Sequence, residues 1–187
     1  MKTLINNGSP RKNGDTEALI NALAARLEGE IKTVTWRDDI SPCLDCRFCW
    51  EHDGCAISDG MQAVYDFWRE CDNVVFASPV WYSSLSGPAL NIASRFQTSF
   101  MARFHRKIPS PATKNGVLIF TGGQPGTEKN PEESARIILR NMNVKKPLVS
   151  VIKSMDTDNI PAKDDAAAIA MAEQAADALN ALGRQLT

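Results

Sequence analysis

The apolar residues of this chain fall into two kinds of run, and the two kinds alternate along the sequence. Short continuous apolar runs are typical of strands that are covered on both faces of a sheet. Longer stretches with apolar side chains three and four residues apart are typical of helices that bury one face. The first kind predicts strands at 4–5, 73–77, 116–120 and 146–151, and an alternating run predicts a further strand at 31–36. The second predicts helices at about 16–27, after 59, at about 88–96, from 130 and at about 164–182.

Two of these segments carry more specific signals. Residues 31–36 alternate apolar and polar side chains, which favours a strand near the edge of the sheet. Asp59 is a residue type that caps helix N-termini, and it precedes apolar residues spaced i, i+3, i+4 and i+7. Those residues are Met61, Val64, Tyr65 and Trp68.

Strands separated by helices predict an α/β fold in three layers, with a doubly wound, five-stranded parallel sheet and helices on both faces. The length of 187 residues suits a single domain, 1–187, and we find no internal repeat or dividing linker. Two connecting segments, 37–58 and 97–113, are longer than usual. Long loops in compact domains usually have a function or are disordered.

The charge balance limits the partners. With 21 basic and 22 acidic residues and a net charge of -1, the chain has neither the footprint of a nucleic-acid-binding protein nor a polybasic membrane patch. It contains no apolar run that predicts a signal peptide or a membrane span. We therefore expect a cytoplasmic protein whose partners are small molecules or other proteins.

The first candidate site is the loop at residues 6–16, between the first strand and the first helix. Small and hydroxyl residues, together with the positive end of a helix, favour binding of a phosphate. The spacing matches neither the dinucleotide fingerprint nor the nucleoside-triphosphate loop, and an ordinary turn is the alternative. The candidate residues are Ser9, Arg11, Asn13, Gly14 and Thr16.

Two further loops follow the predicted strands at 73–77 and 116–120, and in a parallel sheet they lie at the same edge as the first loop. Aromatic and hydroxyl side chains in the first of them suit a planar heterocycle, although surface packing or an oligomer contact would also explain the aromatics. The glycines of the second suit a close approach or simply a turn. The candidates are Pro79, Val80, Trp81, Tyr82, Ser83, Thr121, Gly122 and Gly123.

A cysteine-rich insertion at about 41–58 carries the pattern C-x2-C-x2-C-x5-C, formed by Cys43, Cys46, Cys49 and Cys55. In a cytosolic protein such a concentration indicates metal ligation or redox chemistry. Four thiolates are the ligand set of a [4Fe-4S] cluster or of a structural zinc. Free thiols or a disulfide are further alternatives. Cys71 stands apart and is expected to be a buried, small apolar residue.

Three motifs in the same order resemble the flavodoxin-like NAD(P)H-dependent FMN reductase family. They are the loop Gly8-Ser9-Pro10-Arg11-Lys12-Asn13-Gly14-Asp15-Thr16, the segment Ser78-Pro79-Val80-Trp81-Tyr82 leading to Ser86-Gly87-Pro88, and Thr121-Gly122-Gly123. The cysteine spacing resembles the iron–sulfur flavoprotein branch of that family. Asp15 departs from the pattern, which usually has Asn or Ser there, so we expect its carboxylate to point away from a phosphate, for example as a helix cap.

The resemblance implies that the three loops bind FMN and that the four cysteines ligate a [4Fe-4S] cluster beside it. Hydride would pass from NAD(P)H to flavin N5, a step that needs no catalytic side chain. The acceptor would be a quinone, a flavin or a ferredoxin-like protein. An electron carrier without direct NAD(P)H turnover is the alternative function. The family also implies a homodimer or homotetramer, in which segment 97–113 of a neighbour helps to cover the flavin.

Overall fold

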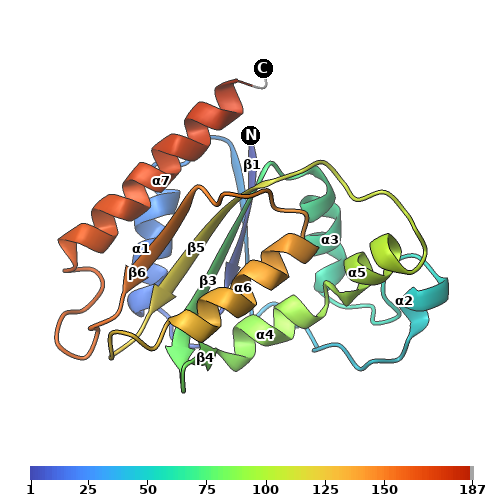
Figure 1. Cartoon of the computed structure of the whole chain (residues 1–187), viewed down its shortest axis with the longest axis horizontal. Coiled ribbons are helices and arrows are strands. Elements are labelled where there is room, and N and C mark those ends of the chain that lie inside the picture. Colours follow the sequence, from blue (N-terminus) through green and yellow to red (C-terminus); the bar gives the residue numbers. More distant parts are fainter. Residues whose placement is uncertain (186–187) are drawn as a thin grey trace.

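A computed structural model describes residues 1–185 of the chain, and its centre is a sheet of five parallel strands (Figure 1). The strand order is β2-β1-β3-β5-β6. This is the doubly wound flavodoxin-like order, so the predicted fold class is confirmed. The strands are β1 (Lys2–Asn7), β2 (Glu30–Thr35), β3 (Asn73–Trp81), β5 (Asn115–Thr121) and β6 (Ser150–Ser154).

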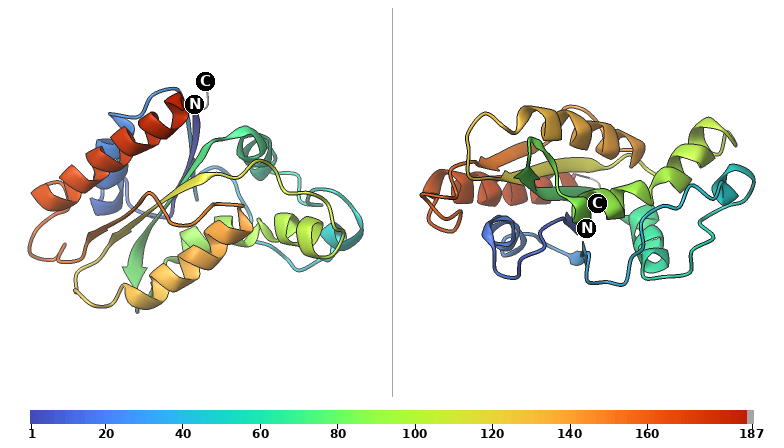
Figure 2. Two further views of the ribbon diagram at one scale, coloured as in Figure 1. Left: turned by 45° about the horizontal axis from the view of Figure 1, so that its top comes forward. Right: turned by 90° about the horizontal axis from the view of Figure 1, so that it is seen from below.

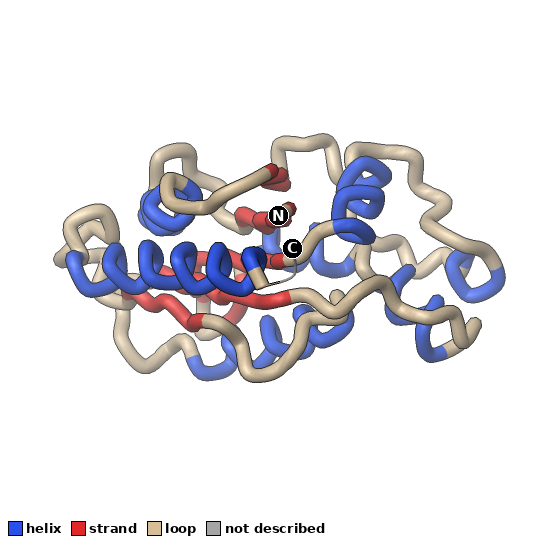
Figure 3. Tube along the Cα trace, turned by 90° about the horizontal axis from the view of Figure 1, so that it is seen from above, coloured by secondary structure: helices blue, strands red, loops and turns tan. Residues whose placement is uncertain are grey.

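Helices cover both faces of the sheet and form the two outer layers (Figures 2 and 3). On one face lie α1 (Asp15–Ala24) and α7 (Ala166–Arg184). On the other lie α3 (Met61–Glu70), α4 (Gly87–Ser94) and α6 (Lys129–Asn141). The short helices α2 (Phe48–Glu51) and α5 (Gln97–Phe104) pack on each other to one side of this second layer (Figure 1).

The continuous apolar run of β3 is explained by burial on both faces. Val74 and Phe76 belong to the core beneath α3, α4 and α6, whereas Val75 and Ala77 belong to the core beneath α1 and α7. Since successive side chains of a strand point to opposite faces, a strand between two helical layers must be apolar at every position. β2, which alternates as predicted, is an edge strand paired only with β1 among the described residues.

Several predicted boundaries were wrong, for local reasons. α1 ends at Ala24 and not near Leu27. The last strand begins at Ser150 and not at 146, and Pro147 in between has no N–H for the ladder. Segment 97–113, expected to be a loop, contains α5, and segment 37–58 contains α2.

The end of β3 also differs from the prediction. The strand continues to Trp81 because it pairs antiparallel with the two-residue strand β4 (Ser84–Leu85). Pro79, Val80 and Trp81, expected in a loop, therefore lie on a strand. Ser86, just after β4, caps α4, since its hydroxyl accepts a hydrogen bond from the backbone N–H of Ala89.

Across residues 1–185, none of the helices combines the length and the apolar character that crossing a bilayer requires.

Candidate functional site

The three predicted loops meet at the carboxyl ends of β1, β3 and β5. The backbone N–H of Gly8 donates to the carbonyl of Ala77 at 2.9 Å, which joins the first loop to β3. The buried hydroxyls of Thr16 and Thr121 lie 2.7 Å apart and join the start of α1 to the end of β5. The structure therefore brings all three loops to one site, as the sequence predicted.

The first loop is shaped by its own side chains. Asn7 accepts a hydrogen bond from the backbone N–H of Ser9 at 3.0 Å, and Ser9 is almost fully buried. Asn13 adopts a left-handed backbone with φ 55°, and its N–H donates to the Glu17 carboxylate. In the described structure no side chain caps α1, whose N-cap is Gly14. The first-turn N–H groups of the helix are thus available for an anion.

Asp15 does not cap α1, which was the example of how its carboxylate could point away from a phosphate. Its Oδ1 accepts a hydrogen bond from the backbone N–H of Ala162 at 3.0 Å, and its Oδ2 accepts one from the Arg11 guanidinium at 2.9 Å. Asp15 therefore attaches the loop to the segment after β6 and offsets part of the charge of Arg11. Beside these residues is an open hollow of about 300 Å³, which Thr157 and Lys163 also line.

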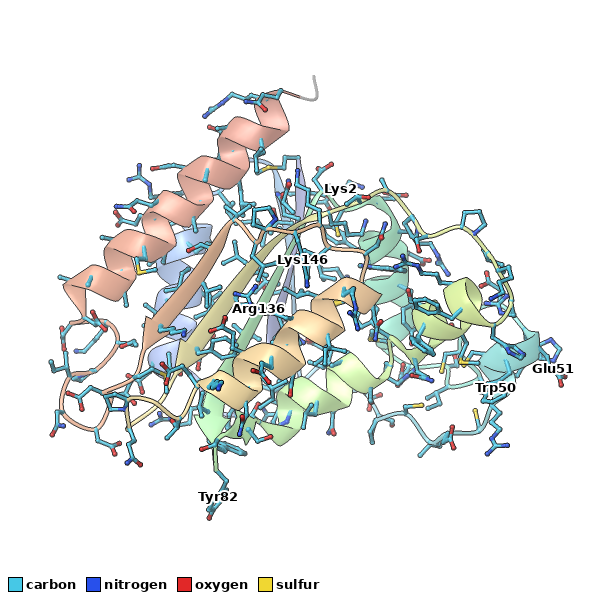
Figure 4. The ribbon with its side chains drawn as sticks, in the orientation of Figure 1. Lys2, Trp50, Glu51, Tyr82, Arg136 and Lys146 are labelled. Carbon is cyan, nitrogen blue, oxygen red and sulfur yellow. The ribbon has the colours of Figure 1, made fainter. Side chains whose placement is uncertain are left out.

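The second loop is a tight hairpin turn between β3 and β4. Tyr82 and Ser83 both have positive φ, 49° and 52°, which is the signature of a type I′ turn. Tyr82 projects into solvent and is completely exposed (Figure 4), and Trp81 is 44% exposed. The alternative that Tyr82 packs on its own chain is therefore wrong.

The third loop is held from behind by the segment that follows β6, which sequence reasoning did not single out. The Gly122 carbonyl accepts a hydrogen bond from Thr157 N–H at 2.9 Å. A Cβ at Gly122 would come within 2.7 Å of Met155 Cε, and one at Gly123 would collide with the Asp158 carboxylate. A side chain at either glycine would thus have to displace the end of Met155 or Asp158.

Two serines that were not named as site residues join the loops. The Ser86 hydroxyl donates to the carbonyl of Gly8 at 2.7 Å, and the backbone N–H of Ser86 donates to Ser78 Oγ at 3.0 Å. Ser86 therefore holds the start of the first loop against the end of β3. The Ser-Gly-Pro motif contained this residue, but only the contact reveals its role.

The four cysteines of the insertion line one small hollow, together with Arg95, Gln97 and Thr98. Cys46 is exposed and the other three are partly buried. Burial raises the pKa of Cys49, and repulsion from Cys43, Cys55 and Cys46 acts in the same direction. All four cysteines thus border the same hollow.

Within residues 1–185 no three metal-binding side chains approach closely enough to hold a single ion. Four cysteines around one hollow are the donor set of a cubane iron–sulfur cluster. The residues present thus fit an iron–sulfur group chemically.

Other candidates lie outside both sites. Cys71 is buried as predicted, and burial raises its pKa to about 11. His52 stacks on Phe48 with ring centres 4.5 Å apart. His105 ends α5 and packs against Trp50 of α2, with ring centres 5.0 Å apart.

Relatives of this chain in sequence include iron–sulfur flavoproteins. The chain is 32% identical over 120 residues to one from Methanosarcina thermophila, a match that covers 62% of this chain and 60% of that protein. It is 33% identical over 90 residues to one from Methanocaldococcus jannaschii, covering 46% and 47%. The chain thus spans about half to three-fifths of the length of these relatives.

Solved structures share the fold at low sequence identity. A protein of Streptococcus mutans UA159, Smu.1420, has a TM-score of 0.67 at 16% identity, covering 97% of this chain and all of that one. An NADH:FMN oxidoreductase in its apo form has a TM-score of 0.61 at 17% identity, covering 97% and 89%.

The sequence profile of the NADPH-dependent FMN reductase family matches residues 1–158, which include all three loops and the cysteine segment. The family and the branch that the motifs resembled are thereby confirmed. This chain belongs to the NADPH-dependent FMN reductase family and is similar to its iron–sulfur flavoproteins.

Proposed function

We propose that this protein binds FMN at the carboxyl ends of β1, β3 and β5 and transfers electrons from NAD(P)H to an acceptor. The observation that carries the proposal is the meeting of the three loops through the Thr16–Thr121 hydroxyl pair and the contact from Gly8 to Ala77. Ligands of doubly wound sheets bind at this edge. Membership of the FMN reductase family supports the identity of the ligand.

The chain has one set of groups for the phosphate end of FMN and another for its ring end. The start of α1, with Ser9, Asn13 and Thr16, suits the phosphate, and Arg11 adds a positive charge on its rim. The glycine turn after Thr121 and the hairpin at Tyr82 suit the two sides of a flat ring. Because the Thr16–Thr121 pair ties the phosphate loop to the glycine turn, the distance between these ends is set by the protein.

Bound FMN supplies a ring that accepts hydride at N5 and can pass on electrons singly or in pairs. The chain does not need an acid or base for this chemistry. Backbone N–H groups of the hairpin and the glycine turn are suited to stabilise negative charge on a reduced ring. Small oxidants such as quinones or free flavin are the acceptors that an exposed ring edge would admit.

We further propose that Cys43, Cys46, Cys49 and Cys55 hold a [4Fe-4S] cluster. The shared hollow and the names of the curated relatives support this assignment. The hollow also favours the second candidate function, an electron carrier that exchanges electrons with ferredoxin-like proteins and does not turn over NAD(P)H.

We expect a homodimer or homotetramer. The surfaces that would meet a second subunit are the exposed side chains of Trp81 and Tyr82 and the segment 97–113.

The test is the visible absorption spectrum of anaerobically purified protein, recorded before and after adding NADH, NADPH and then dithionite. Flavin bands that bleach with a nicotinamide support the reductase. Bands that bleach only with dithionite support the electron carrier, and no flavin bands after incubation with FMN would refute both.

The cluster is tested in the same samples with C46A and with C71A as the matched control. A broad iron–sulfur absorption that C46A loses and C71A keeps supports the assignment, because Cys71 lies in the core away from the hollow. The cluster assignment fails if the wild type contains no iron and sulfide after anaerobic reconstitution.

A further inference from the structure

Arg95, directly after α4, carries a charge that is completely buried, and the proposed electron transfer does not use it. A buried guanidinium is costly unless it is paired and hydrogen-bonded. Its Nη1 lies 2.5 Å from Asp59 Oδ2, and its Nη2 donates to Asp59 Oδ1 at 3.1 Å. The pair is thus a two-pronged ion pair between the end of α4 and a residue two positions before the start of α3.

The same guanidinium joins the two ends of the cysteine segment. Nη1 donates to the carbonyl of Ser41 at 2.8 Å, and Nη2 donates to the carbonyl of Ile57 at 3.3 Å. Asp59 completes the closure, because its carboxylate accepts a hydrogen bond from the N–H of Ser41 at 3.1 Å. Ser41 and Ile57 each lie two residues outside the four cysteines, so Arg95 and Asp59 close the loop at its neck.

Neighbours of Arg95 hold the loop at further points. Ser94 Oγ accepts a hydrogen bond from Cys43 N–H at 3.0 Å, and Thr98 Oγ1 donates to the carbonyl of Gly54 at 2.8 Å. Tyr65 of α3 fixes the backbone of Arg95 through a 2.8 Å hydrogen bond to its carbonyl. The shape of the cysteine loop is therefore imposed by the junction between α4 and α5.

One donor of Arg95 lacks a hydrogen-bond partner among residues 1–185. This donor is its buried Nε, and Arg95 lines the hollow that the cysteines share. Buried donors in proteins are almost always paired. A group bound in the hollow would provide the missing acceptor.

We infer that Arg95 is a positioning residue of the cysteine site, which closes the neck of the loop with Asp59 and offers its Nε–H and charge to the bound iron–sulfur group. The second part rests on the proposed cluster, whereas the first concerns the loop in the metal-free protein. Hydrogen bonds and positive charge near a cluster favour its reduced, more negative state, and so raise its reduction potential.

The first test is hydrogen exchange on metal-free protein under reducing conditions. R95Q leaves Asp59 buried without its partner and can unfold the chain, so the main variant is D59L/R95M, which removes both charges. The matched control is D177L/R26M, which removes the two-pronged pair between Arg26, just after α1, and Asp177 of α7. We expect amides of 41–58 to exchange at least about tenfold faster in D59L/R95M only, with the β3 and β5 amides unchanged. Equal protection of the loop in D59L/R95M and wild type would overturn the closure.

The second test is the iron content and the midpoint potential of the anaerobically reconstituted proteins. We expect D59L/R95M to retain less than about half of the iron of the wild type, and its cluster to have a lower midpoint potential. We expect R95K to retain iron, also with a midpoint potential below that of the wild type, because lysine has no Nε–H. Equal iron content and equal potentials in all variants would overturn the role toward the cluster. If the wild type binds no iron, the proposed cluster fails, and the exchange data still decide the closure.

Discussion

Replacing Gly8 by alanine adds one methyl group at the point where the first loop contacts α4 and β3, and so tests how closely these elements pack. A Cβ added at Gly8 would lie 2.5 Å from Ala89 Cβ and 2.9 Å from the carbonyl oxygen of Ala77. Neither neighbour is the end of a flexible side chain, so G8A must push the first loop away from α4 and β3. Overpacking of this kind costs about 1–3 kcal/mol of the free energy of unfolding.

The magnitude can be measured by urea unfolding. With a slope of about 2 kcal/mol per molar urea, a loss of about 2 kcal/mol lowers the midpoint by about 1 M. FMN affinity should also fall, by about tenfold for each 1.4 kcal/mol of binding free energy that is used to restore the shape of the loop. Fluorescence titration with FMN measures this loss.

The matched control is G87A, at the start of α4. A Cβ at Gly87 meets nothing within 4 Å, and alanine favours a helix more than glycine does, so G87A should equal the wild type or exceed it by up to about 1 kcal/mol. Adding A89G to G8A should recover part of the loss. Wild-type stability and FMN affinity in G8A would refute the close approach of the loop to α4.

Contacts at the two sites support three other predictions. T121V leaves the buried Thr16 hydroxyl unpaired, so the free energy of unfolding should fall by about 1–3 kcal/mol, and an unchanged value would contradict the hydroxyl pair. Burial opposes ionisation of Asp59, but hydrogen bonds from Arg95 and the backbone outweigh it and lower its folded-state pKa. The stabilisation by Asp59 is therefore complete above its unfolded pKa of about 4, and it is lost as pH falls through the lower folded pKa. Urea midpoints measured over this pH range should fall with pH in the wild type, and D59N should flatten this dependence. Y82A should leave the urea midpoint unchanged, because Tyr82 is fully exposed, and should lower FMN affinity or weaken self-association, as seen by titration and analytical ultracentrifugation. A variant equal to wild type in both would remove Tyr82 from the site.

Several features were already determined by the sequence. The run at 73–77 is apolar at every position after Asn73 because β3 lies between two helical layers, and the alternation at 31–36 marks the edge strand β2. The motif order also predicted which loops meet, since the carboxyl ends of parallel strands share one edge of the sheet. These are signals of local periodicity and chain order, which a sequence displays directly.

Only the tertiary structure decided how the loops are held together. Thr16 and Thr121 are 105 residues apart, and nothing in the spacing of either pairs their hydroxyls. The close approach of the Asp158 carboxylate to Gly123 and the closure of the cysteine loop by Arg95 are likewise contacts between distant segments. Charged residues tend to stay in water, so the sequence alone predicts that the Arg95 side chain is exposed. Its burial becomes favourable only when folding brings Asp59 and the carbonyls of Ser41 and Ile57 around it.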